Sequence, residues 1–282
     1  MRNLLTVIWR IITSPFRWFG RTFNQVQIFL TEEPEDTPIG DSFQKAVDNP
    51  NEILYHLNDL RKHIFRAIAF LAITTVFSFI FTSQIIDFLA RPIGGIGELI
   101  AIDPTEPIGV FMRVALLSGF AIAFPYIALE LWLFAAPGLS RNARIFGLIA
   151  IPIATLFFLG GMAFAYFVML PTALPFLLNF MGLQTVPRPS SYLRFVTSVM
   201  FWLGIAFQFP LIIYVLAVLG FVNSRMLIQQ WRIAIVIIAI AAAMITPTID
   251  PVNMALVMGP MIILFFLSIL LAGFAERGRR ET

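Results

Sequence analysis

The chain has 282 residues, of which 59% are apolar and only 12% are charged. Soluble domains carry roughly a quarter charged residues, so this composition excludes an ordinary soluble protein and indicates an integral membrane protein. The absence of cysteine excludes disulfides and thiol catalysis, and the presence of only two histidines disfavours a Cys/His metal site. The net charge of +3 carries little information, because in membrane proteins the sidedness of Lys and Arg matters more than their sum.

Residues 1–31 predict a basic amphipathic helix that lies on the membrane surface. At 100° per residue the apolar side chains fall in one sector, and Arg10, Arg17 and Arg21 lie opposite. These arginines interrupt every apolar run and no small-residue cleavage site follows, so a cleavable signal peptide is not expected. Residues 32–49 are acidic and contain Pro and Gly, which predicts a flexible linker.

Residues 49–66 predict a helix that begins in water and continues into the first long apolar segment. Asn49 can cap this helix, and Pro50 suits its first position. Apolar side chains recur at spacings of four, three and four, which places Asp59 on another, polar face just outside the membrane, with Lys62 and His63 one turn on. One interpretation is a solvated face that anchors a spanning helix. The alternative is a binding surface.

Six apolar segments predict an all-α integral membrane protein with six transmembrane helices. They span about residues 64–89, 108–136, 146–171, 193–220, 231–246 and 252–272. A spanning helix needs about 20 residues, so the fifth span, with about 16, is predicted to be short. The sixth span is also assigned as a short one. The helices are predicted to be kinked by prolines, with Pro125, Pro152, Pro210 and Pro260 at membrane depth. The core is thus assigned to residues 50–275 and a basic cytoplasmic tail to residues 276–282.

The distribution of Lys and Arg predicts that both termini are cytoplasmic. With the N-terminus inside, all but four of the 19 basic residues lie on the inner side. The four on the outer side are Arg91, Arg113, Arg188 and Arg194. The outer loops are then expected at about residues 91–107 and 172–192.

Three ionisable residues at or within the membrane boundary are functional candidates, because inserting a charge costs several kcal/mol. Glu130 is predicted about 10 Å from the cytoplasmic end of the second span, where it either binds a ligand, reaches the interface or pairs with Arg144. Arg113 lies near the outer end of that span, where it can also extend outward to water. Asp250 is either a ligand or, more simply, a cap for the sixth helix.

No enzyme is predicted. The sequence has no Gly-rich phosphate loop after a strand, no metal-ligand spacing and no nucleophilic triad, so neither a metal nor a cofactor is expected.

Four motifs in order resemble those of the TatC family of the twin-arginine protein translocase, over about residues 50–275. These are residues 56–61 (HLNDLR), 134–139 (FAAPGL), 161–167 (GMAFAYF) and 246–251, which carry the Thr-Pro and Asp-Pro pairs. The resemblance implies a signal-peptide receptor and translocase core in a bacterial or archaeal cytoplasmic membrane. It also implies binding of twin-arginine signal peptides at the cytoplasmic face, and export of folded proteins driven by the proton-motive force. Single-span TatA- or TatB-like proteins are the implied partners, with a homo-oligomer inside a receptor complex and no nucleic acid.

The resemblance also assigns residues. Its signal-peptide surface comprises Asp59, Leu60, Arg61, Phe134, Pro137 and Leu139. Structural or partner-contacting positions are Pro92, Arg113, Tyr166, Gln208 and Asp250.

The chain departs from the family pattern at two positions that usually carry an acid. Ala143 stands where the loop after the second span usually has a second glutamate, and Gln208 replaces a carboxylic acid in the fourth span. Two guanidinium groups need two acceptors. We therefore hypothesise that Glu130 supplies the second carboxylate of the signal-peptide site.

Two other functions fit parts of the sequence. An ion-coupled secondary transporter could use Glu130, Arg113 and the proline-broken spans, although it would predict internal repeats and a polar midplane site, neither of which is evident. A membrane insertase would need only a lone Arg in a wet groove. Binding of a twin-arginine precursor, compared with a lysine-substituted one, separates these alternatives.

Overall fold

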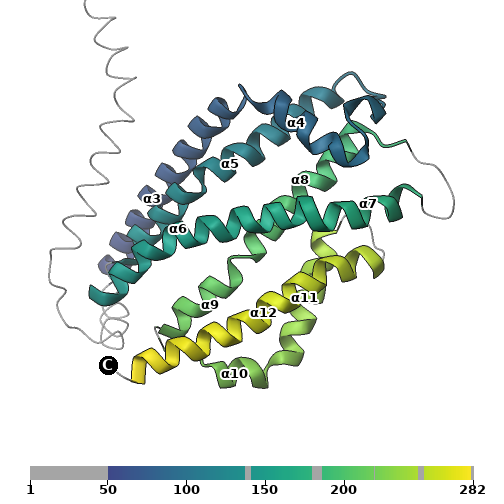
Figure 1. Cartoon of the computed structure of the whole chain (residues 1–282). Helices are drawn as coiled ribbons and strands as arrows, with labels where there is room; N and C mark the ends of the chain where they lie inside the picture. The colour runs from purple at the N-terminus through teal and green to yellow at the C-terminus, as the bar shows by residue number, and fades with distance from the viewer. Residues whose placement is uncertain (1–49, 137–140, 180–185, 219, 247–250, 281–282) are drawn as a thin grey trace, which may run out of the picture. The chain divides into compact units, whose positions relative to one another are not determined.

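The computed structural model is predominantly helical over the described part of the chain. The described residues are 50–136, 141–179, 186–218, 220–246 and 251–280, and this part contains helices and connecting turns but no strand (Figure 1). The all-helical prediction is therefore confirmed there. The surface helix predicted for residues 1–31 and the linker at 32–49 lie outside the described residues.

The chain divides into two compact units. The first contains residues 1–68 and 126–151, and the second contains residues 69–125 and 152–282. Two of these boundaries fall at prolines, Pro125 and Pro152, where a helix loses a backbone hydrogen bond.

The first unit brings together three helix segments. They are the first part of α3 (Pro50–Ser78), the last part of α5 (Glu106–Ala135) and the first part of α6 (Arg141–Phe164). Helix α3 begins at Pro50, as predicted, because the fixed φ of proline suits the first helical position and its missing N–H is not needed there. Trp132, Leu133 and Ala136 of α5 are buried against α6, where Leu148 and Ile151 pack on them.

The first predicted span is not one continuous helix. Helix α3 ends at Ser78 and α4 (Thr82–Ala90) follows at 76° after a three-residue turn. In the turn, the N–H groups of residues 79–81 donate to the carbonyls three residues back, and the Thr82 hydroxyl donates to the Ser78 carbonyl at 2.8 Å. The turn contains neither Pro nor Gly, so no local sequence signal marks it.

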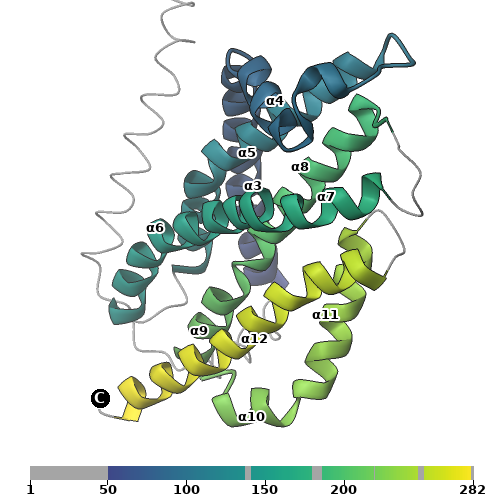
Figure 2. The same cartoon turned by 45° about the vertical axis from the view of Figure 1, so that its right-hand side comes forward.

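The remaining helices belong wholly or mainly to the second unit. After the short turns η1 (Arg91–Ile93) and η2 (Ile96–Glu98), the chain forms α5, α6, the π-helix η4 (Ala165–Met169), α7 (Leu170–Leu178), α8 (Pro189–Ala206), α9 (Phe209–Val218), α10 (Ser224–Gln229), α11 (Trp231–Ile245) and α12 (Pro251–Arg280). Helix α12 packs along α9 and α11 (Figure 2).

The second predicted outer loop is shorter than expected. Helix α7 extends to Leu178 although it contains Pro171 and Pro175, and α8 already begins at Pro189. Pro171 lies in the first turn of α7, directly after the π-helix. Proline has no N–H to donate to the helix. At Pro171 this loss is tolerated, because the change from π-helix to α-helix already alters the hydrogen bond that this N–H would make, and the helix continues.

The fifth predicted span matches α11, which has 15 residues, but the expectation of a short sixth span is wrong. Helix α12 has 30 residues and continues through residues 276–280, which were assigned to the tail. Charged residues end the apolar pattern without ending the helix. Glu276 lies on this extension and accepts hydrogen bonds from the backbone N–H and the hydroxyl of Ser224 at the start of α10.

The core of the second unit rests on aromatic rings and close helix contacts. Phe124 and Phe158 stack at 4.3 Å between ring centroids. Gly204 lies against the Phe158 ring, where an added Cβ would come within 2.7 Å. Gly161 lies against the backbone of α8, with 2.7 Å between a built Cβ and the Leu203 carbonyl oxygen. Only glycine permits helices to approach this closely.

Among the described residues, four helical segments are long and apolar enough to cross a membrane, and the bent pair α3–α4 makes five if it forms a single span. The four are Glu106–Ala135, Gly147–Leu178, Pro189–Val218 and Pro251–Glu276, and α11 is the shorter apolar helix. Large apolar side chains are exposed along these helices, including Leu156 at 70% and Ile263 at 69%. Such continuous apolar exposure is typical of a surface that faces lipid.

Candidate functional site

The first unit contains a buried carboxylate held by three side chains. Glu130 of α5 is only 1% exposed, yet it lies in a segment of otherwise apolar composition. The Tyr126 hydroxyl, one turn earlier on the same helix, donates to its Oε1 atom. On α3, His63 Nδ1 lies 2.6 Å from Glu130 Oε2, and Arg66 Nη1 lies 3.8 Å from the same oxygen. A charge this deeply buried is tolerated only when it is paired and hydrogen-bonded, as it is here.

Asp59 lies one turn before His63 and is turned toward solvent. Its side chain is 33% exposed, with Lys62 Nζ 3.5 Å from Oδ1 and His63 Nε2 3.6 Å from Oδ2. His63 therefore stands between two carboxylates, with one ring nitrogen toward each. The spacings of three and four residues place Asp59, His63 and Arg66 along one side of α3.

Phe134 provides an aromatic surface beside this polar cluster. Its ring lies 4.6 Å from the His56 ring and 6.3 Å from the His63 ring, measured between centroids. It lies one turn after Glu130 on α5, so a helical face places the two side by side. Of the other predicted surface residues, Leu60 is half-buried and Arg61 is exposed.

Two contacts hold the end of α5 against the start of α6. Gly147 lies directly on the indole of Trp132, since a Cβ built on it would come within 2.0 Å of Trp132 Nε1. Arg144 is buried and its Nε donates to the Ala136 carbonyl at 3.0 Å, which satisfies a carbonyl that the helix end leaves unpaired. Pro137 and Leu139 lie outside the described residues, and the side chain of Ala143 is also not described.

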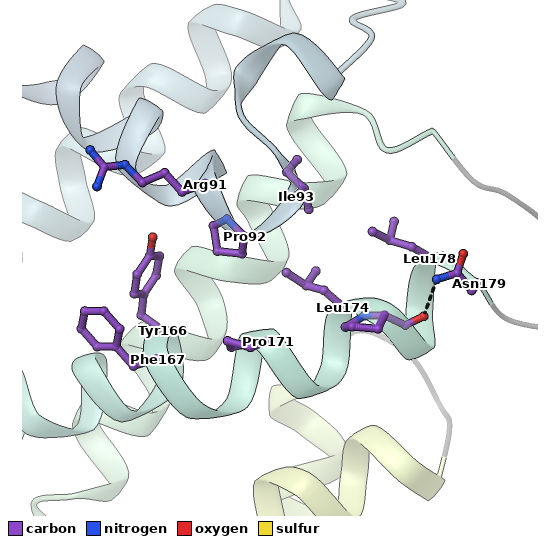
Figure 3. Close-up of a pocket in the computed structure, with 10 residues that line it drawn as sticks. Arg91, Pro92, Ile93, Tyr166, Phe167, Pro171, Leu174, Leu178 and Asn179 are labelled. Carbon is purple, nitrogen blue, oxygen red and sulfur yellow. Dashed lines mark hydrogen bonds between the residues drawn. The ribbon is translucent and has the colours of Figure 1, made fainter.

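Two predicted residues, Pro92 and Tyr166, line one cavity in the second unit (Figure 3). The Tyr166 ring stacks on Phe88 at 4.4 Å, and its hydroxyl donates to the Phe88 carbonyl at 2.7 Å. The Arg91 guanidinium also lies over the Phe88 ring, 5.3 Å from its centroid. The cavity measures about 570 Å³ and is lined by Arg91, Pro92, Ile93, Tyr166, Phe167, Pro171, Leu174, Pro175, Leu178 and Asn179. Tyr166 thus fixes the end of α4 to the π-helix.

The remaining predicted residues are not members of the polar cluster. Gln208 is buried at the break between α8 and α9, and its Nε2 donates to the Ala154 carbonyl of α6 at 3.0 Å. Arg113 is exposed on α5. Asp250 lies outside the described residues.

Three members of the cluster around Glu130 are not identified by the sequence patterns. The helical spacing shows His63 only as a neighbour of Asp59, and the charge distribution shows Arg66 only as an inner-side charge. Tyr126 carries one usable signal, its spacing of four residues before Glu130. Within the described part of the chain, no group of three or more His, Cys, Asp or Glu side chains is placed to hold a metal ion.

These features define a class: a multi-spanning helical membrane protein in which side chains of two neighbouring helices hold a buried carboxylate. The sequence comparisons are more specific. Residues 55–260 match the family described as Sec-independent protein translocase protein (TatC). The chain belongs to this family.

Curated relatives and solved structures agree with that assignment. The chain is 34% identical over 240 residues to the Sec-independent protein translocase protein TatC of Koribacter versatilis, covering 81% of this chain and 89% of the relative. It is 33% identical over 249 residues to the TatC of Deinococcus radiodurans, covering 85% and 91%. A crystal structure of the twin-arginine translocase receptor TatC in DDM superposes with a TM-score of 0.70 at 32% identity, covering 77% of this chain and 99% of that one.

The family assignment decides between the functional classes. The chain is a component of a protein translocase, a membrane transport protein and not an enzyme. The comparisons do not favour the secondary transporter or the insertase.

Proposed function

We propose that this chain is the signal-peptide receptor and core component of a twin-arginine translocase. The observation that carries the proposal is Asp59: a partly exposed carboxylate on α3, supported from behind by His63 and the buried Glu130. A guanidinium group binds a carboxylate through two parallel hydrogen bonds, and such pairs are stronger where water is partly excluded. The arginine pair of a signal peptide is the ligand that suits this site.

The proposed binding surface extends from Asp59 over its neighbours. Leu60 and Arg61 continue it along α3, and Phe134 contributes an aromatic ring beside His56 on which an arginine side chain can stack. Pro137 and Leu139 complete the surface in the proposal by their family positions.

Glu130 is proposed as the second carboxylate of the site. Arg66 Nη1 is its most distant partner, 3.8 Å from Oε2, and is 27% exposed. A peptide guanidinium can take the place of Arg66 at this oxygen, so Glu130 stays paired. Arg66 can leave because its side chain can turn to water. Glu130 also supports Asp59 indirectly, since it fixes the His63 ring between the two acids.

The wider setting is part of the same proposal. The core spans a bacterial or archaeal cytoplasmic membrane six times with both termini inside, as the Lys and Arg distribution favours. Signal peptides bind at the cytoplasmic face, and folded precursor proteins pass outward with single-span TatA- or TatB-like partners, driven by the proton-motive force. The receptor complex contains several copies of this chain. In the second unit, Pro92, Tyr166, Arg113, Gln208 and Asp250 serve structural or partner contacts.

The test is binding of a precursor with two consecutive arginines, compared with the same precursor carrying two lysines. The wild-type chain in detergent should bind the arginine form at least about tenfold more tightly, a difference of about 1.4 kcal/mol. Asp59→Asn should abolish this preference with the protein still monodisperse, and Asp59→Glu should retain it because the charge is kept on a partly exposed side chain. The matched control is Asp87→Asn, which changes an exposed aspartate on a different helix, α4. Equal binding by wild type and Asp59→Asn would refute the assignment.

A further inference from the structure

Both histidines of the chain lie in the candidate signal-peptide site. The sequence contains only two, His56 and His63, and both rings contact Phe134. Imidazole is the side chain whose ordinary charge change falls between about pH 5 and 8. The candidate site thus contains every imidazole of the 282-residue chain.

The geometry at His63 gives that change a defined target. An ionised Glu130 can only accept hydrogen bonds, so in that state the proton in the 2.6 Å contact belongs to His63 Nδ1. In the neutral ring, Nε2 then carries a lone pair and faces Asp59 Oδ2 at 3.6 Å without attraction. In the protonated ring, Nε2 carries a proton as well, and the imidazolium forms an ion pair with Asp59.

The charges around His63 show why one proton matters. The two carboxylates, Asp59 and Glu130, are matched by Lys62 and Arg66 on α3 when His63 is neutral. From α5, Tyr126 faces Glu130 as a hydroxyl donor, and on α6 the described charged side chain, Arg144, donates to the Ala136 carbonyl. His56 stacks on Phe134. Protonation of His63 gives this cluster a surplus positive charge, against which a doubly cationic ligand must bind.

We propose that His63 is a positioning residue that makes arginine recognition at Asp59 dependent on protons: neutral His63 leaves Asp59 available to the guanidinium, and protonated His63 competes for it. This inference rests on the proposed signal-peptide function. Peptide binding and proton uptake by His63 then oppose each other, so binding displaces a proton from His63 to solvent and weakens as the pH falls.

The first experiment measures affinity for a twin-arginine peptide in detergent between about pH 5.5 and pH 8, the range over which an imidazole titrates. The wild-type chain should bind about fivefold more weakly at the acidic end, which corresponds to one partly exposed ion pair. His63→Gln is neutral at both ends of the range, so its affinity should no longer depend on pH. His63→Arg is always charged and should bind at the weaker level throughout. His56→Gln, which removes the other imidazole, should keep the pH dependence.

A pH profile that His63→Gln leaves unchanged, or one that His56→Gln removes, overturns the inference. If the wild-type chain binds the twin-arginine peptide no more tightly than the same peptide with two lysines at any pH, the proposed signal-peptide function falls instead. The two failures are thus distinguishable.

A second measurement needs no peptide. Nitrogen-15 imidazole signals can be assigned by using His56→Gln, which leaves His63 as the one histidine. Neutral His63 should show a protonated Nδ1. The Nε2 signal should change in Asp59→Asn, because the carboxylate that faces this nitrogen at 3.6 Å is lost. Signals that are identical in Asp59→Asn and wild type overturn the inference and leave the receptor function untouched.

Discussion

Replacing Glu130 by an apolar residue should destabilise the protein more than replacing it by an amide. In Glu130→Leu, the His63 ring and the Tyr126 hydroxyl both lose their acceptor, whereas Arg66 is 27% exposed and can reach water. In Glu130→Gln, the amide oxygen still accepts a hydrogen bond from one of the two donors. The variant loses the negative charge, and its amide nitrogen, itself a donor, faces the other donor.

The burial of these groups sets the magnitude. Tyr126 is 4% exposed and the His63 side chain 11% exposed, so neither donor is readily solvated. Each unsatisfied buried group costs about 1 to 3 kcal/mol, so Glu130→Leu should lower the free energy of unfolding by about 4 kcal/mol. Glu130→Gln should cost about 1 to 2 kcal/mol, the difference between charge-assisted and neutral hydrogen bonds. At about 2 to 4 °C per kcal/mol, these losses correspond to roughly 12 °C and 5 °C in Tm.

Thermal unfolding in detergent, followed by intrinsic fluorescence and by the loss of monodisperse protein, measures both variants. The triple variant Tyr126→Phe, His63→Leu, Glu130→Leu supplies the control, because it removes the donors together with the acceptor. It should recover at least half of the Tm lost in Glu130→Leu alone, since replacing a whole buried polar set by apolar groups is nearly neutral. If Glu130→Leu unfolds at the wild-type temperature, or if the triple variant is the least stable, Glu130 is not held by these partners.

Two further predictions concern topology and the missing family acid. A reporter active only outside the membrane should be silent when fused after Arg280 and active when fused near Pro187, and the reverse result would contradict the six-span arrangement with both termini inside. Glu130→Gln should weaken twin-arginine peptide binding by about tenfold, and Ala143→Glu in that background should restore most of it because a second acceptor returns. An equal gain from Ala143→Glu with and without Glu130 would show that the two positions do not share this role.

The positions of the apolar helices were predictable because hydropathy is a local property. Helix α5 at Glu106–Ala135 nearly coincides with the predicted second span, and α11 at Trp231–Ile245 with the fifth. Insertion into lipid depends on the composition of about 20 consecutive residues, so a short window contains the information. Helix ends were less predictable. Helix α12 continues beyond Glu276, where a charged residue ends the hydropathy signal but bonds to Ser224 on another helix.

The bend after Ser78 shows a second limit. The turn at residues 79–81 lacks the proline or glycine that usually signals one. Ser78 contacts the Ser118 hydroxyl of α5, and Thr82 bonds back to Ser78. Polar groups of a neighbouring helix and a local hydroxyl thus stabilise a break that the pattern of residues 64–89 does not contain.

Composition and spacing along one helix were enough to establish the class of protein, the helical segments and Asp59 as a polar residue near the start of the first long helix. They left three roles open for Glu130, which could pair with Arg144, reach the interface or bind a ligand. The folded structure places Glu130, 67 positions from His63, in a buried network with that histidine and Arg66. Such partners are selected by how α3 packs against α5, and the pattern along either helix alone does not contain that packing.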